Sequence, residues 1–457
     1  MITTSPPSIE IKQKNQFFKR RSELGLILLA NLIVDSAYIL VNLSLHSKIP
    51  SNLFLFILVA LLISLAAHVA NWILVPKADG VILPVVLLLN GLGYVMIYRL
   101  DVFNKRPEAP NQLLWTVIGV TVYIATMAIV KRSRDLDRYR YLLLMASIIL
   151  LASPLVPGVG ADINGARLWV VIGGLAFQPV EIAKLTLTIF FASYFVEKRE
   201  MLTISTKRFG NRMIPDLRPF GPLALALALS LFAIGTEHDV GFSLLLFVLF
   251  VSMIWLATGK LSYVVVGLVL FAVGTFVGSH VLVQVNARIF GWLHPYSNPF
   301  GTIPNKPSGY QLIQGMVSLA RGGIGGKGWG LGLTGIYVPV PQSDYIFAAF
   351  GEELGLFGAT AILVGFLLIV GSGLRIAATA RSEFSKLLAA GLTILIGFQT
   401  FFILAGIERV LPLTGITLPW MSYGGSSLIS NYFLLAILMR ISTEANDRSL
   451  DDILNTV

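Results

Sequence analysis

The 457-residue chain has no cysteine and few charged residues. Without cysteine it can form neither a disulfide nor a thiolate metal or redox site. Charged residues make up 13% of the chain, against about 25% in a typical soluble domain. Hydrophobic residues make up 55%. This composition excludes an ordinary soluble domain and predicts a polytopic membrane protein.

Hydrophobic runs near the ~20 residues that a bilayer requires occur about twelve times. We therefore expect an all-α polytopic membrane protein with about twelve transmembrane helices and one large structured outward loop. The first run lacks a small-residue cleavage site, so we do not read it as a signal peptide. The expected spans are 24–45, 53–75, 81–99, 112–130, 141–157, 181–197, 220–236, 240–258, 262–283, 346–374, 387–407 and 423–441.

The chain divides by these spans into two tails, an added pair of helices and a core. Residues 1–22 form a basic cytoplasmic tail, for which we expect no regular structure, and 442–457 form a second cytoplasmic tail. Residues 23–80 are an N-terminal addition of two helices. Residues 81–441 are a ten-helix core, because the residues that could carry chemistry begin only there.

Lysine and arginine predict the orientation of the bundle. They gather in the N-terminal tail, in 131–140 and in 198–218, and an even number of spans puts all three on one side. Such clusters mark the cytoplasmic side, so both termini of this plasma-membrane protein are expected there. The net charge of +10 thus sets topology and does not indicate nucleic acid binding. The segments expected to face outward are 158–180, 284–345 and 408–422.

The outward loop 284–345 is rich in glycine, proline and aromatic residues. It has no Asp or Glu between Gln284 and Ser343, and its cationic or titratable residues are Arg288, His294, Lys306, Arg321 and Lys327. Its run GGIGGKG is not a nucleotide-binding P-loop, because an arginine occupies the first glycine position and a glycine replaces the Ser or Thr that binds Mg²⁺. The glycines either let backbone N–H groups approach phosphate or permit close packing.

Two further outward segments carry polar residues into the membrane. In 160–185, Glu181 and Lys184 share one helix face. Charges inside a span are costly, so they form either an internal ion pair or a polar lining, with Lys184 or Arg167 facing an anionic ligand. In 405–430, small residues and hydroxyls indicate close helix packing or a turn lining a cavity. The consecutive Glu237, His238 and Asp239 indicate a hydrated turn, not a metal site.

Several motifs together resemble the SEDS family (FtsW/RodA/SpoVE type), the membrane proteins of rod shape, division and sporulation that polymerise peptidoglycan glycan strands. They are NGARLWVVIGGLAFQPVEIAKL, GYQLIQG, GGIGGKGWGLG, SDYIFAAFGEELG and LPLTGITLPWMSYGGSS, in this order. The resemblance implies an inverting peptidoglycan glycosyltransferase with lipid II as donor and acceptor, acting in cell division or elongation beside a class B penicillin-binding protein. It leaves the first two spans as an addition, as in some actinobacterial-type members. The substrate-binding candidates in these segments and the loop are Arg167, Trp169, Glu181, Lys184, Arg288, Gln311, Lys327, Glu352, Ser422 and Ser426.

One departure from the family pattern affects the catalytic base. The family's loop normally carries an Asp in the stretch corresponding to 288–301, taken as catalytic, and here His294 and Asn298 occupy the corresponding positions. Asp344 in the matching SDYIF motif could be the base, as could His294, whose unperturbed pKa of about 6.5 suits the task. The third alternative is an inactive scaffold. We favour an active enzyme, and the sequence leaves a divalent cation open.

Physical reasoning agrees with the resemblance. Nucleotide sugars are not available outside the membrane, so a donor there must be carried on a lipid pyrophosphate. Its transfer needs a base for the acceptor hydroxyl and a cation for the departing pyrophosphate. A lipid II flippase is an alternative, motivated by the charges of Asp35, Glu181 and Lys184 within spans. The concentration of polar groups at the outer ends of the spans argues against it.

Overall fold

The computed structural model of the chain describes residues 7–103, 107–163, 166–172, 175–203, 207–209, 212–214, 228, 240–303 and 307–454. The α-helices are α1 Pro7–His46, α2 Leu53–Leu74, α3 Ile82–Leu100, α4 Ala109–Ile129, α5 Arg140–Ala152, α6 Val180–Glu197, α7 Arg199–Thr203, α9 Val240–Thr258, α10 Leu261–Val281, α11 Val283–Leu293, α12 Tyr310–Gly322, α13 Thr334–Tyr337, α14 Ile346–Thr379, α15 Glu383–Ile407 and α16 Gly425–Leu454. Four 3₁₀ turns are η1 Asp101–Phe103, η2 Ser133–Tyr139, η3 Ser153–Leu155 and η4 Pro295–Ser297.

Ten helices in the described ranges are long and apolar enough to cross a membrane. They coincide with ten of the twelve expected spans, which confirms an all-α polytopic membrane protein. The expected span 181–197 is also a helix, α6, although its charges keep it out of that set. Of the remaining expected span, 220–236, the structure describes only residue 228.

Both ends of the chain are more regular than expected. The tail 1–22 was expected to lack regular structure, and this expectation is wrong from Pro7 on, because α1 begins there and runs into the first span. Between Pro7 and Arg20 the sequence has no glycine or further proline to interrupt a helix. At the other end α16 continues to Leu454, so most of the C-terminal tail extends the last membrane helix.

A small antiparallel sheet, which the sequence did not lead us to expect, forms in the segment 158–180. Its strands are β1 Gly160–Ile163, β2 Ala166–Ile172 and β3 Leu175–Phe177, in the order β1-β2-β3. The β-branched residues Val170, Val171 and Ile172 favour an extended backbone. A separate hairpin pairs β4 Lys207–Phe209 with β5 Arg212–Ile214.

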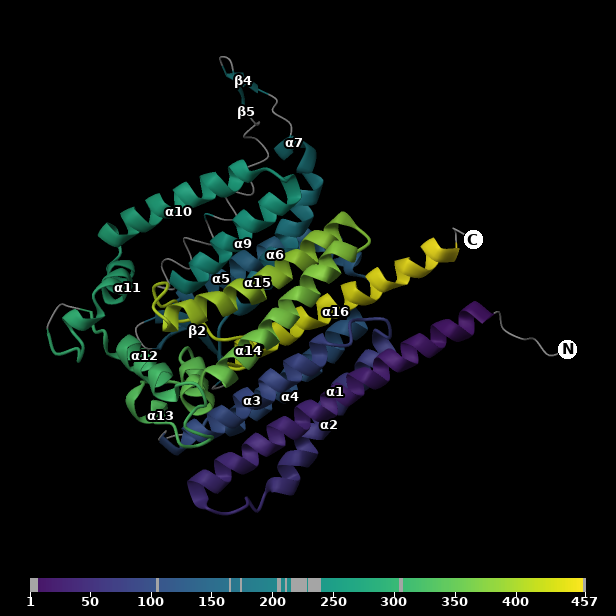
Figure 1. Cartoon of the computed structure of the whole chain (residues 1–457). Coiled ribbons are helices and arrows are strands. Elements are labelled where there is room, and N and C mark those ends of the chain that lie inside the picture. Colours follow the sequence, from purple (N-terminus) through teal and green to yellow (C-terminus); the bar gives the residue numbers. More distant parts are fainter. Residues whose placement is uncertain are drawn as a thin grey trace.

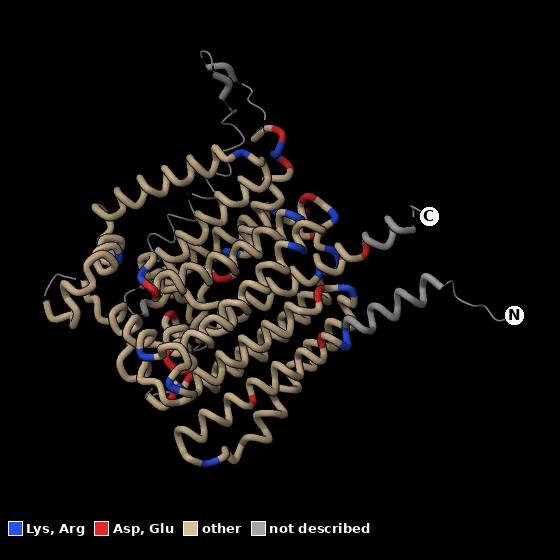
Figure 2. Tube along the Cα trace, viewed as in Figure 1, with Lys and Arg blue, Asp and Glu red and all other residues tan. Residues whose placement is uncertain are grey.

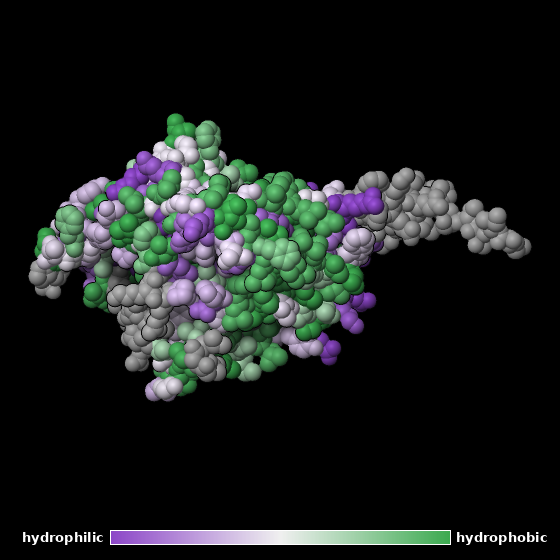
Figure 3. All heavy atoms as spheres, turned by 90° about the horizontal axis from the view of Figure 1, so that it is seen from below, coloured by the Kyte–Doolittle hydropathy of each residue, from purple (hydrophilic) through white to green (hydrophobic). Residues whose placement is uncertain are grey.

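The membrane helices lie side by side in one bundle (Figure 1). α1 and α2 form one flank and pack on α3 and α4, whereas α10 forms the opposite flank and packs on α9. α1 begins and α16 ends at one end of the bundle, and α11, α12 and α13 lie at the other. The middle of the face in Figure 3 is largely hydrophobic, as expected of a lipid-facing surface.

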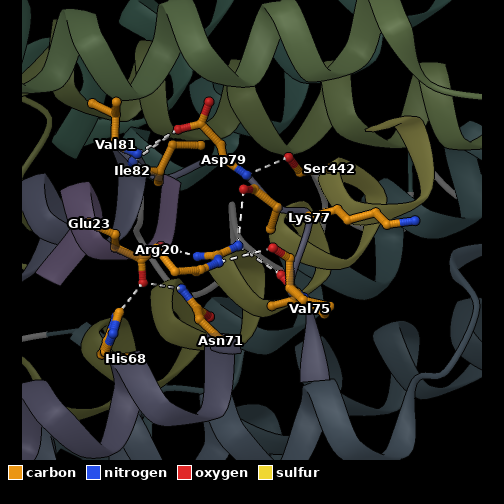
Figure 4. Close-up of polar contacts among 12 residues, drawn as sticks. Arg20, Glu23, His68, Asn71, Val75, Lys77, Asp79, Val81, Ile82 and Ser442 are labelled. Atoms are coloured by element: carbon orange, nitrogen blue, oxygen red, sulfur yellow. Dashed lines mark hydrogen bonds and ion pairs between the residues drawn. The ribbon is translucent and has the colours of Figure 1, made fainter. Parts of the chain in front are cut away.

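A buried polar cluster joins α1 to α2 and to the segment that leads from α2 into α3 (Figure 4). Arg20 on α1 forms an ion pair with Glu23 and donates to the carbonyls of Val75 (2.8 Å) and Ala78 (3.0 Å), which follow α2. Glu23 also accepts a hydrogen bond from Asn71 and contacts His68 Nδ1 at 2.9 Å. Both charges of the pair are almost fully buried, so each depends on the other.

Candidate active site

The outward loop begins with α11, which is tied to the segment between α15 and α16. Arg288 is half-buried, and its Nη1 donates to the carbonyl of Leu413 at 3.0 Å and to that of Thr414. One turn on, Trp292 Nε1 donates to the Arg409 carbonyl at 2.9 Å, and Arg409 Nε donates back to the Trp292 carbonyl at 3.0 Å. These bonds fix α11 and the Arg288 guanidinium on the segment between α15 and α16.

Asp344 lies just before α14 begins, within reach of the charge of Arg288. Its carboxylate Oδ1 accepts a hydrogen bond from Ser343 Oγ at 2.8 Å. Burial raises the pKa of Asp344, and this effect outweighs the opposing influence of Ser343 and of the Arg288 charge. A carboxylate with a raised pKa is a stronger base than an ordinary aspartate, which suits it to remove a proton from a hydroxyl.

The start of α16 holds Asp344's neighbours in place. Ser422 Oγ donates to the carbonyl of Ser343, and the N–H of Tyr423 donates to the Gln342 carbonyl at 2.8 Å. Gln112 Nε2 on α4 donates in turn to the Ser422 carbonyl at 3.3 Å. Ser422 therefore acts on Asp344 through the backbone. Ser426 accepts from the N–H of Gln178 at 2.9 Å, which joins α16 to the start of α6.

The two residues that replace the family's loop aspartate take different positions. His294 is exposed at the end of α11, with its ring 5.3 Å from that of Phe290. Asn298 is fully buried, and its amide bonds both the carbonyl and the N–H of Ile303 at 3.2 Å. Asn298 thus closes a turn, and only His294 is open to a substrate.

The glycine-rich segment is folded around two buried carboxylates at the start of α14. Glu352 accepts from the N–H groups of Leu333 (2.9 Å) and Thr334 (2.7 Å). Glu353 accepts from the N–H of Gly330 at 2.8 Å and forms an ion pair with Arg99 Nε at 2.6 Å. Glu352, a substrate-binding candidate, is therefore engaged in holding the loop.

The side chains of the other polar residues in the loop make fewer contacts than those of Glu352 and Glu353. Lys327 has an exposed side chain, while its N–H donates to the Glu352 carbonyl at 3.0 Å. Gln311 Nε2 donates to the Pro339 carbonyl at 3.2 Å. Arg321, half-buried, lies 3.8 Å from Glu352 Oε1. Lys327 is thus a loop cation presented to solvent.

Glu181 and Lys184 form the internal ion pair that was one of the two interpretations. Their side chains are fully buried, with Nζ and Oε2 2.6 Å apart. Lys184 also donates to Gln399 Oε1 on α15 at 2.9 Å, and Ser430 Oγ on α16 donates to Glu181 at 2.7 Å. The pair joins three helices in the bundle interior. Its second interpretation, a role toward an anionic ligand, stays a prediction.

The structure describes some of the candidate residues only in part. Trp169 is half-buried on β2, opposite Ala161. The side chain of Arg167 lies outside the described residues, as do Lys306 and the cluster Glu237 to Asp239. The described part of the chain contains no group of three His, Asp or Glu side chains placed to hold a metal ion.

Sequence reasoning missed Arg99, Gln112 and Gln399. Each is a polar residue in or beside an expected span, and the cost of placing such groups in a membrane could have marked Arg99 and Gln399 as partners of buried charges. Gln112 gave no such signal, since it opens an expected span where polar residues are common.

Comparisons with known proteins agree on one family. The model of the cell cycle proteins FtsW, RodA and SpoVE matches residues 80–447. The peptidoglycan glycosyltransferase RodA of Mycobacterium tuberculosis is 42% identical over 431 residues, covering 93% of this chain and 90% of the relative. The probable peptidoglycan glycosyltransferase FtsW of Geobacter sulfurreducens is 30% identical, over 81% of this chain and 96% of the relative.

Solved structures show the same fold. A chain from a peptidoglycan synthase complex in which polymerization and crosslinking are coordinated superposes with a TM-score of 0.64 at 25% identity, over 80% of this chain and 98% of that one. The rod shape determining protein RodA of Thermus thermophilus superposes with a TM-score of 0.56 at 24% identity, over 81% and 98% of the two chains.

Proposed function

Because this chain belongs to the cell cycle protein family of FtsW, RodA and SpoVE, we propose that it is a peptidoglycan glycosyltransferase that polymerises lipid II on the outer face of the cytoplasmic membrane. The observation that carries the proposal is a carboxyl group whose pKa is raised, Asp344, on which the charge of the Arg288 guanidinium acts. A basic carboxylate and a fixed cation are the two groups that glycosyl transfer from a lipid pyrophosphate requires.

Asp344 acts as the general base. In its ionised form it takes the proton of the acceptor hydroxyl as that oxygen attacks the anomeric carbon of the donor sugar. The new C–O bond forms as the bond to the pyrophosphate oxygen breaks, so the configuration inverts. The pyrophosphate leaves with the electron pair and Asp344 keeps the proton.

Arg288 stabilises the negative charge that develops on the leaving pyrophosphate. Two backbone carbonyls hold its Nη1, so little reorganisation is needed when that charge appears. The exposed Lys327 is a second cation on the same loop, free to contact a phosphate as the lipid enters or leaves.

The arrangement of charges supports an outward position for this site. Lys and Arg residues gather at the end of the bundle where α1 begins and α16 ends (Figure 2). By the positive-inside tendency that end is cytoplasmic, and α11 to α13 then lie outside with both termini inside. The similarity to a chain of a peptidoglycan synthase complex supports a class B penicillin-binding protein as partner.

Reconstitution in vesicles tests this function against transport and scaffolding. The purified chain, with its partner, is supplied with labelled lipid II, and glycan length and lipid exposure are measured in parallel. Polymer that forms without the partner's transpeptidase activity supports the proposal. Movement of lipid II across the bilayer without polymer would instead indicate a flippase, and neither activity in a folded preparation would indicate a scaffold.

A further inference from the structure

A partly open cavity of about 180 Å³ lies between the N-terminal pair of helices and the core. Its walls come from α1, α2, α3, α4 and α16, and include Asn31, Tyr38, Ala60, Asn90, Thr116 and Tyr432. α1 and α2 precede residue 80, where the family match begins. One side of the cavity is therefore built by helices outside the matched core.

Most polar groups of the cavity wall have a hydrogen-bond partner within the protein. Asn90 Nδ2 donates to Tyr432 Oη at 3.1 Å, and Thr116 Oγ1 lies 3.3 Å from Asn90 Oδ1. Asn31 Nδ2 donates to the Ile27 carbonyl at 2.9 Å, and Tyr38 Oη donates to Asn52 at 3.1 Å. Since these groups already have partners, the cavity offers little to a polar ligand or to water, which needs two to four polar contacts.

The depth of the cavity determines which molecules can reach it. Its residues on α1 and α3 lie well inside the spans Arg20–His46 and Ile82–Phe103. At that depth the surroundings of the bundle are lipid hydrocarbon. Leu55 lines the cavity and is nevertheless 60% exposed, so the cavity reaches the lipid-facing surface of α2.

We propose that this cavity binds the end of one phospholipid acyl chain. An empty apolar space forfeits the dispersion contacts that a chain would supply. A cavity of roughly 150 Å³ accepts one benzene-sized molecule, so this one holds a short length of a single chain. That size suits the tip of an acyl chain, the most abundant hydrocarbon at this depth, better than a long methyl-branched polyprenyl chain.

Photo-crosslinking tests the site directly. The full chain is reconstituted in vesicles of phosphatidylethanolamine and phosphatidylglycerol that contain a phosphatidylglycerol with a diazirine at the end of one acyl chain. Labelled residues are mapped by mass spectrometry. Labelling in 52–64 and 87–94 should exceed, by several-fold, labelling in α10, whose apolar side chains are largely exposed and report ordinary lipid contact.

Two tryptophan variants on the same helix separate the cavity from the lipid surface. Ala60→Trp fills the cavity and should bring its labelling down to the level of α10. Leu62→Trp changes a residue that is 56% exposed and not part of the cavity wall, and should leave the labelling unchanged. Ala30→Phe fills the cavity from α1 and serves if Ala60→Trp does not elute as a folded protein.

The proposal is overturned if the wild-type chain labels the cavity no more than α10, a comparison that needs no variant. It is also overturned if Ala60→Trp or Ala30→Phe folds and keeps full labelling. Labelling of the cavity by a polyprenyl phosphate diazirine but not by the phospholipid would assign the space to the substrate lipid instead. None of these readouts depends on polymerase activity.

Discussion

The charge of Arg288 acts on Asp344, although Arg288 stands near the start of the loop 284–345 and Asp344 near its end. The charge of Arg288 lowers the pKa of the Asp344 carboxyl, while burial raises it more strongly. Asp344 is thus more basic than an ordinary aspartate, even though the positive charge of Arg288 acts on it. The predictions below follow from this relationship and from the contacts that maintain it.

The pH dependence of polymerisation should report the ionisation of Asp344. A base must be deprotonated, so the rate should fall as the pH falls through a pKa above the ordinary value of about 3.9. Arg288→Gln removes the effect that lowers this pKa and should move the acid limb to higher pH. Arg321→Gln, which removes a loop cation beside Glu352, should leave the position of the limb unchanged, even if the maximal rate changes.

The same pKa shift has a consequence for stability. Because the folded-state pKa is raised, the stabilising contribution of Asp344 is present below its ordinary value and is lost as the pH rises through the raised one. Asp344→Asn should therefore raise the thermal unfolding temperature at neutral pH and have less effect in acid. An equal change at both pH values would argue against a raised pKa in the folded protein.

The Arg99–Glu353 pair should behave as a buried ion pair. Removing one partner leaves the other charged and buried, so Arg99→Met or Glu353→Leu alone should cost about 3–5 kcal/mol. The double variant should cost less than the sum of the two. The matched control is the exposed pair Arg199–Glu383, whose loss should cost about 0–1 kcal/mol. Thermal unfolding in detergent measures all of these changes, and additive costs would contradict the pairing.

Two neighbouring glycines test whether the glycine-rich segment needs the backbone conformation and close packing that glycine allows at Gly326. Gly326 has φ +81°, and a Cβ there would lie 2.3 Å from the Glu353 carbonyl oxygen. Gly326→Ala should therefore be destabilising by roughly 1–3 kcal/mol, and should lower polymerisation by displacing the loop. Gly325→Ala meets nothing within 4 Å and should be nearly neutral. Equal effects of the two variants would show that the loop does not adopt this packing.

Arg20 should hold α1 to the segment between α2 and α3. Arg20→Met leaves Glu23 buried without its cation, at a cost of about 3–5 kcal/mol, and frees the carbonyls that follow α2. The variant should expose residues 75–81 to limited proteolysis, and Arg20→Met with Glu23→Leu should partly restore protection. Protection equal to that of the wild-type chain in the single variant would show that other contacts suffice.

Much of the fold could be predicted from the sequence, because a bilayer imposes a length and a composition on each span. Hydropathy located ten helices, and the ion pair of Glu181 and Lys184 is one of the two interpretations that their spacing on one helix face left open. The sheet β1 to β3 was not predicted, since its strands are short and interrupted by glycines. The segment from Pro7 to Arg20 was wrongly expected to lack regular structure, because polar residues can extend a membrane helix into water.

The candidate site was predicted only in part. Asp344 and Ser422 were singled out from motifs and Arg288 as a cation of the loop, but their relative placement depends on how the loop folds back. Sequence position could not show that Glu352 is engaged by backbone N–H groups or that Asn298 is buried in a turn. Such assignments depend on side-chain direction, which tertiary packing sets.

The most direct test of the account compares Asp344→Asn with His294→Ala in lipid II polymerisation by the folded chain and its partner. The amide of Asp344→Asn keeps the size of the side chain but cannot accept a proton. We expect Asp344→Asn to lower the polymerisation rate by about 10²–10⁴-fold. We expect His294→Ala to polymerise at a rate close to that of the wild-type chain. Full activity of Asp344→Asn, or an equal loss in His294→Ala, would contradict the assignment of Asp344 as the base.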